Sequence, residues 1–114
     1  MKKIIAVDFD GTVAVTNYPE IICPIQSVID YVKSEQQNGA ILILWTCRHG
    51  KFLAESIEWC KEQGLTFDYI NKNVPELIAE YGDCRKIYAD EYIDDKAINI
   101  KAIIENVEDT PCNL

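Results

Sequence analysis

The sequence predicts a single α/β domain in which a central, mainly parallel sheet lies between two layers of helices. Short apolar runs alternate along the chain with segments whose apolar residues recur at helical spacing, a pattern typical of repeated βαβ units. The chain has 114 residues, enough for one hydrophobic core, so residues 1–114 are taken as one domain. Polar residues follow the predicted strands, at the edge where sheets of this kind bind ligands. We therefore expect a Rossmann-like three-layer α/β/α sandwich.

The first half of the chain alternates strand and helix patterns. Residues 3–7 form a short apolar run that predicts a buried strand, and residues 11–23, which lack a clear period, predict a loop or a small hairpin. Pro24 suits the first turn of a helix with apolar residues at helical spacing, and Gly39 ends that helix. Residues 40–45 are continuously apolar, as expected of a central parallel strand that is covered on both faces.

The second half repeats the alternation. Residues 52–63 have apolar side chains at helical spacing and predict a second helix. Residues 66–70 are rich in strand-forming residues, and a short helix is expected after Pro75. Tyr92 and Ile93 predict a fourth strand. A last helix should carry an apolar side made of Ala97, Ile100, Ile103, Ile104 and Val107.

Composition and charge exclude several classes of protein. Hydrophobic residues make up 48% of the chain and charged residues 26%, the balance of an ordinary globular protein. No apolar run approaches the roughly 18 residues that span a bilayer, and the N-terminal run is too short for a signal-peptide core, which predicts a cytoplasmic protein. The formal net charge of −8 opposes binding to nucleic acid, although a divalent cation can reverse the local sign. Five unevenly spaced cysteines and a single histidine, His49, argue against a disulfide framework, a zinc site or a multi-histidine metal centre.

Two carboxylates follow the first predicted strand. Asp8 and Asp10 are two residues apart, so they point to the same side of extended backbone, and Gly11 permits the turn that follows. Because neighbouring carboxylates repel each other, the pair calls for a cation, and Mg²⁺ prefers such oxygen ligands. Asp94 and Asp95 form a second acidic pair at the end of another strand. We expect a magnesium site built from Asp8, the backbone carbonyl of Asp10 and Asp94.

The order of these residues resembles that of the haloacid dehalogenase-like (HAD) hydrolase superfamily. Residues 8–12, Asp-Phe-Asp-Gly-Thr, are similar to its first motif, Thr46 at a strand end to its second, and Ile-Asp-Asp at 93–95 to its fourth. The resemblance implies that Asp8 attacks phosphorus to form an aspartyl-phosphate, while Asp10 acts first as general acid and then as general base. It implies that Thr46 binds a phosphoryl oxygen, and that Asp94 holds Mg²⁺ with Asp95 either as a direct ligand or in support. The expected activity is Mg²⁺-dependent hydrolysis of a phosphate monoester.

The third motif of the superfamily is a Lys or Arg that offsets negative charge, and two positions match it. Lys72 follows the third strand and precedes a predicted helix start, which favours it. Lys86, with Arg85 beside it, precedes the fourth strand and stays open as the alternative. Further contacts with substrate are expected from the neighbours of the motifs, namely Gly11, Thr12, Cys47 and Arg48, and from Lys86.

The connections leave no room for a cap domain. Only about a dozen residues separate Thr12 from the first helix, and few separate Ile70 from Pro75. In the superfamily that the chain resembles, open sites suit phosphate on large or macromolecular substrates, or are closed by a neighbouring subunit. The expected partner is a phosphorylated small molecule or a macromolecular phosphoester, and a second copy of the chain would close the site. Two other readings remain: a catalytically silent binding protein of the same fold, and a receiver-like module that accepts a phosphoryl group. Steady turnover of a phosphate ester separates the enzyme from both.

Overall fold

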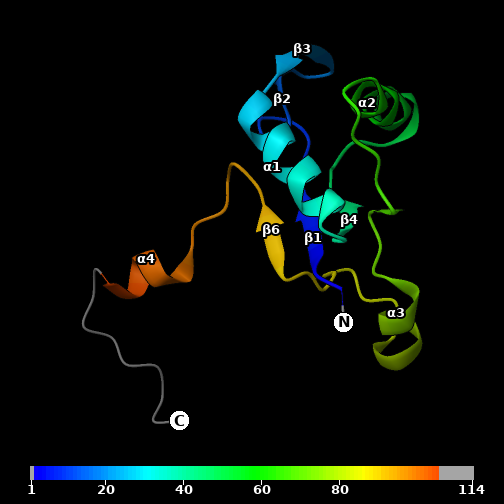
Figure 1. Ribbon diagram of the computed structural model, residues 1–114, viewed down its shortest axis with the longest axis vertical. Helices are drawn as coiled ribbons and strands as arrows, with labels where there is room; N and C mark the ends of the chain where they lie inside the picture. The colour runs from blue at the N-terminus through cyan, green and yellow to red at the C-terminus, as the bar shows by residue number, and fades with distance from the viewer. Residues whose placement is uncertain (1, 106–114) are drawn as a thin grey trace.

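The computed structural model describes residues 2–105 and has a four-stranded parallel sheet at its centre (Figure 1). Strands β1 (Ile4–Val7), β4 (Ile41–Leu44), β5 (Tyr69–Ile70) and β6 (Glu91–Ile93) lie in the order β5-β4-β1-β6. β1 is buried along its whole length because it pairs in parallel with β4 on one side and with β6 on the other. The predicted α/β class with a parallel central sheet is confirmed.

Each face of the sheet has its own hydrophobic core, because alternate side chains of a strand point to opposite faces. Helices α1 (Gln26–Gln37) and α2 (Gly50–Glu62) pack on one face. Helix α3 (Pro75–Tyr81) and residues 87–89 pack on the other. Each of these helices begins within about two residues of its predicted start, where an apolar periodicity sets in. Within residues 2–105, no helix is both long and apolar enough to cross a membrane.

A β-hairpin stands at the end of the sheet to which the strands point (Figure 1). Its strands are β2 (Ala14–Asn17) and β3 (Glu20–Pro24), which pair in antiparallel fashion with an irregularity between Val15 and Thr16. The sequence left open whether residues 11–23 form a loop or a small hairpin, and the structure shows a hairpin. The hairpin fills the first position where a cap could be inserted, and only residues 71–74 join β5 to α3. Within residues 2–105, neither position carries a cap domain, as predicted.

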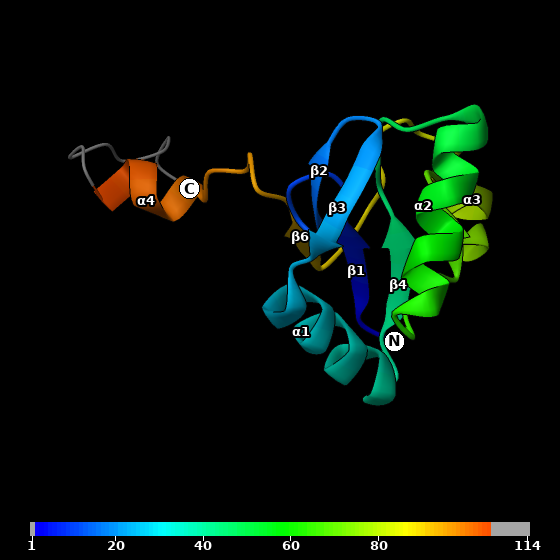
Figure 2. The same ribbon diagram turned by 90° about the horizontal axis from the view of Figure 1, so that it is seen from above.

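Helix α4 (Ile100–Glu105) lies apart from the sheet (Figures 1 and 2). The predicted helix is present, but its isoleucines are not packed against the body of the molecule: Ile100 is 66% exposed and Ile103 is 55% exposed. The expected member Val107 lies outside the described residues. A helical apolar pattern predicts that a helix has an apolar side, but it does not predict which surface covers that side.

Candidate functional site

The carboxyl ends of the four strands meet at one edge. Three backbone hydrogen bonds continue the sheet one residue beyond the strands: the N–H of Asp8 donates to the carbonyl of Ile93, that of Trp45 to Val7, and that of Asn71 to Leu44, at 2.9, 2.8 and 2.8 Å. The residues that follow the strands are thus held in register with one another. This is the edge at which open α/β sheets bind ligands.

A pocket of about 420 Å³ opens at this edge. It is lined by Asp8, Trp45, Thr46, Cys47, Asn71, Arg85 and Asp94. Three residues that were expected to converge, Asp8, Thr46 and Asp94, therefore share one pocket although they are far apart in the chain. The exposed Cys47 lies at the same pocket, where a substrate contact was expected.

Three carboxylates gather here. Asp8, Asp94 and Asp95 each offer an oxygen, and these oxygens all lie within 4.8 Å of one another. Burial, reinforced by the negative charge of Asp94, raises the pKa of Asp8 to about 6, against the opposing effect of a hydrogen bond from Thr12. Oxygen donors at this spacing fit a divalent cation such as Mg²⁺, which keeps part of its shell for water or phosphate. The side chains present thus match the predicted metal.

Gly11 and Thr12 assemble this cluster. Gly11 has φ +79°, and a Cβ at this position would lie 2.5 Å from Oδ2 of Asp95, so only glycine allows the close approach. The Thr12 hydroxyl donates to Oδ2 of Asp8 at 3.1 Å and accepts the N–H of Asp95 at 3.0 Å. The two residues were expected to contact substrate. The structure places both of them against Asp95, where they join the loop after β1 to the loop after β6; the substrate contact stays a prediction.

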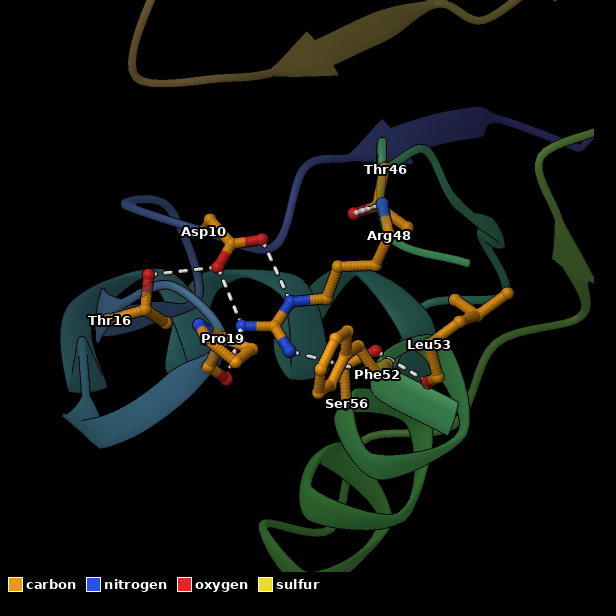
Figure 3. A network of polar contacts seen from close by, with 8 residues as sticks. All are labelled: Asp10, Thr16, Pro19, Thr46, Arg48, Phe52, Leu53 and Ser56. Atoms are coloured by element: carbon orange, nitrogen blue, oxygen red, sulfur yellow. Dashed lines mark hydrogen bonds and ion pairs between the residues drawn. The ribbon is translucent and has the colours of Figure 1, made fainter. Parts of the chain in front are cut away.

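The Asp10 side chain is directed toward Arg48 (Figure 3), and its carboxylate is not part of the cluster. The guanidinium of Arg48 donates from Nε to Oδ2 of Asp10 at 2.9 Å and from Nη2 to Oδ1 at 2.7 Å. The Thr16 hydroxyl donates to Oδ1 at 2.8 Å. The hydrogen bonds from Arg48, aided by Thr16, hold the pKa of Asp10 below its ordinary value. The carboxylate of Asp10 is thus committed to Arg48 and Thr16, and the expected role of its backbone carbonyl in the metal site stays a prediction.

Arg48 was expected to contact substrate, and its placement differs from that expectation. Its side chain is fully buried and does not line the pocket. Besides Asp10, it donates to the carbonyls of Pro19 and Phe52 at 3.1 and 3.3 Å. Because Arg48 lies two residues after Thr46, it was expected to lie at the site. The direction of its side chain depends on contacts with the hairpin and α2. Residue spacing does not predict these contacts.

Thr46 is fixed by backbone and side-chain contacts at the end of β4. Its N–H donates to Oδ1 of Asn71 at 2.8 Å, and its hydroxyl oxygen accepts the N–H of Arg48 at 3.1 Å. A hydroxyl that accepts one hydrogen bond still has a proton to donate. Asn71 adopts a left-handed conformation with φ 54°, which Asn tolerates better than most residues. Asn71 was not among the predicted site residues, and its position directly after β5 was the available signal.

The structure brings neither predicted lysine into the pocket. Nζ of Lys72 lies over the ring of Tyr69, 5.9 Å from its centre, and Lys86 lines a separate hollow beside α3. Arg85 lines the pocket with Asp8 instead. Lys72 was favoured because it follows a strand, but residues 71–74 turn directly into α3. Arg85 lies in an irregular segment, where no periodicity reports which side chains face the sheet edge.

These features define a class: a Rossmann-like α/β protein that holds a carboxylate cluster, a threonine and an arginine around one open pocket. A scan against protein-family models and a search of curated proteins gave no match. Among solved structures, the chain is similar to a conserved protein coded by a locus of Bacteroides thetaiotaomicron, with 38% sequence identity and a TM-score of 0.75. The match covers 96% of this chain and 94% of that chain. The chain belongs to the same family as that conserved protein.

Proposed function

We propose that this protein is a Mg²⁺-dependent phosphatase of the HAD type, which hydrolyses a phosphate monoester through an aspartyl-phosphate on Asp8. The observation that carries the proposal is the convergence of Asp8, Asp94 and Asp95 within 4.8 Å at the pocket lined by Thr46 and Arg85. A nucleophilic carboxylate, ligands for a cation and donors for phosphoryl oxygens are then present in one place.

The first chemical step is attack by a carboxylate oxygen of Asp8 on phosphorus. An oxygen–phosphorus bond forms to Asp8, and the bond to the leaving alcohol breaks as Asp10 donates a proton to that oxygen. In the second step water attacks the aspartyl-phosphate, Asp10 takes the proton of the water, and phosphate leaves with Asp8 restored. Oδ1 of Asp10 accepts two hydrogen bonds and Oδ2 accepts one, so Oδ2 is the oxygen with room for the transferred proton.

The remaining groups bind and neutralise the phosphoryl group. Thr46 donates its hydroxyl proton to a phosphoryl oxygen, and the guanidinium of Arg85 binds a second one. Mg²⁺, when held by Asp8, Asp94 and Asp95, would offset the repulsion between the Asp8 carboxylate and the phosphate dianion. Arg85 therefore takes the part of the third-motif cation that the sequence assigned to Lys72 or Lys86.

The volume of the open pocket indicates the class of substrate. A volume of about 420 Å³ suits a small phosphate ester, and because residues 2–105 include no cap, a larger phosphorylated partner also has room to reach Asp8. We propose a phosphorylated small molecule or a macromolecular phosphoester as substrate, with a second copy of the chain as a possible cover for the open site. The net charge of −8 disfavours long nucleic acid.

Phosphate release from a panel of phosphorylated metabolites, with and without Mg²⁺, tests the proposal. We expect turnover that requires Mg²⁺, is abolished in Asp8→Asn, and is unchanged in Asp30→Asn, an exposed aspartate on α1. Self-phosphorylation about once per chain without turnover would indicate a receiver-like module. The absence of both reactions would indicate a binding protein.

A further inference from the structure

We propose that Arg48 is a positioning residue, which orients the Asp10 carboxyl group toward the leaving alcohol and fixes the hairpin beside it. The inference rests on the proposed function, because it concerns the proton donor of that reaction. It assigns to Arg48 no contact with phosphate. Four of its five N–H groups are already committed to Asp10, Pro19 and Phe52.

The contact between Arg48 and Asp10 fixes the plane of the Asp10 carboxyl group as well as its distance from the guanidinium. Nε and Nη2 of Arg48 reach the two different oxygens of Asp10, at 2.9 and 2.7 Å, in the fork geometry that matches a carboxylate (Figure 3). An isolated aspartate side chain rotates about two bonds. Two parallel hydrogen bonds from a rigid guanidinium remove that freedom, so the carboxyl group is held in one orientation before a substrate arrives.

Arg48 can act as a fixed support because three parts of the chain enclose it. Its guanidinium lies 4.8 Å from the centre of the Phe9 ring and 5.1 Å from that of Tyr18, between two aromatic side chains. Its donors also reach the carbonyl of Pro19 in the hairpin turn and that of Phe52 in α2. The loop after β1, the hairpin and α2 therefore meet at one buried cation. Arg48 thus links the hairpin to Asp10, the proposed proton donor, through hydrogen bonds to both.

The arrangement differs from that of a buried ion pair with a structural role alone. The Arg48 side chain is 0% exposed, whereas that of Asp10 is 30% exposed. The cation is thus entirely covered, while part of the Asp10 carboxylate stays accessible. Arg48 stays protonated throughout. The proton that reaches the leaving oxygen comes from Asp10 as the phosphorus–oxygen bond breaks, and Arg48 neither gains nor loses one.

The dependence of rate on the leaving group tests this role. An aryl phosphate such as p-nitrophenyl phosphate leaves as a stable phenolate and needs little help from an acid, whereas ethyl phosphate needs a proton. We expect Arg48→Met to lower kcat/KM for ethyl phosphate by about 10²-fold or more and that for p-nitrophenyl phosphate by less than about 10-fold. Arg48→Lys keeps the charge without the fork and should fall between the wild type and Arg48→Met. The control Lys61→Met, which removes an exposed charge on α2, should change neither rate.

If Arg48→Met folds poorly, a double-mutant cycle still tests the positioning role of Arg48. In an Asp10→Asn background, Arg48→Lys should have no further effect on ethyl phosphate, because Arg48 acts through Asp10. Equal losses on both esters, or additive effects in the cycle, would overturn the positioning role while leaving the proposed function intact. A wild-type protein that hydrolyses neither ester would overturn both.

Discussion

Replacing Asp8 by Asn should stabilise the metal-free protein, although it destroys the proposed nucleophile. Burial beside two other carboxylates makes ionised Asp8 unfavourable, which is why its pKa rises from 3.8 to about 6. Asn is neutral and nearly the same size, and its side-chain oxygen can still accept the hydrogen bond from Thr12. The substitution therefore removes an electrostatic penalty and retains the packing.

The magnitude follows from the rise in pKa. At about 1.36 kcal/mol for each tenfold change in proton affinity, that rise amounts to roughly 3 kcal/mol at pH 7. Asp8 is only half-buried, and solvent screening reduces the figure to about 1–2 kcal/mol. Because the folded protein holds the proton more tightly than the unfolded chain, the penalty is absent below about pH 4 and grows until about pH 6. The advantage of Asp8→Asn over the wild type should appear across that window.

Urea denaturation with EDTA, at pH 5 and at pH 7.5, measures this difference. Adding Mg²⁺ should stabilise the wild type at pH 7.5, more weakly at pH 5 where protons compete, and should have little effect on Asp8→Asn. Asp30→Asn is the matched control and should behave as the wild type throughout. A metal-free Asp8→Asn protein that is less stable than the wild type at pH 7.5, or an advantage that does not grow with pH, would refute the reasoning.

Two further substitutions test the assembly of the site. Gly11→Ala should lower Mg²⁺ affinity by about 10–100-fold, because its Cβ would displace Asp95, and isothermal titration calorimetry that finds unchanged affinity would contradict this. Arg85→Met should weaken competitive inhibition by inorganic phosphate by about tenfold or more, whereas Lys72→Met and Lys86→Met should change it less than about twofold. Equal effects of the three substitutions would remove Arg85 from its assigned role.

Much of the site followed from the sequence because strand ends are easy to locate. Apolar runs end abruptly at Asp8, Thr46 and Asp94, and the parallel topology requires that these ends share an edge. The separate task of the Asp10 side chain came from the resemblance to the HAD superfamily, because the spacing predicted only that Asp8 and Asp10 point to the same side. The geometry of one sheet was therefore enough to bring together residues that are far apart in the chain.

What the sequence did not predict depends on irregular segments and on side-chain direction. Arg85 lies in the segment between α3 and β6, which has no periodicity, whereas Lys72 was favoured because it follows a predicted strand. Arg48 was placed at the site, but its direction toward Asp10 depends on carbonyls of the hairpin and α2 that come from elsewhere in the fold. The exposure of α4 is a third example, since an apolar helical face does not reveal its neighbours.

The identity of the phosphorylated residue tests the central claim most directly. Asp10→Asn should slow hydrolysis of the intermediate, so that acid quenching traps it, and borohydride then converts a phosphorylated aspartate to homoserine for mass spectrometry. The expected result is Mg²⁺-dependent homoserine at position 8 and at no other aspartate. Modification elsewhere, or turnover with Asp8 left unmodified, would contradict the account.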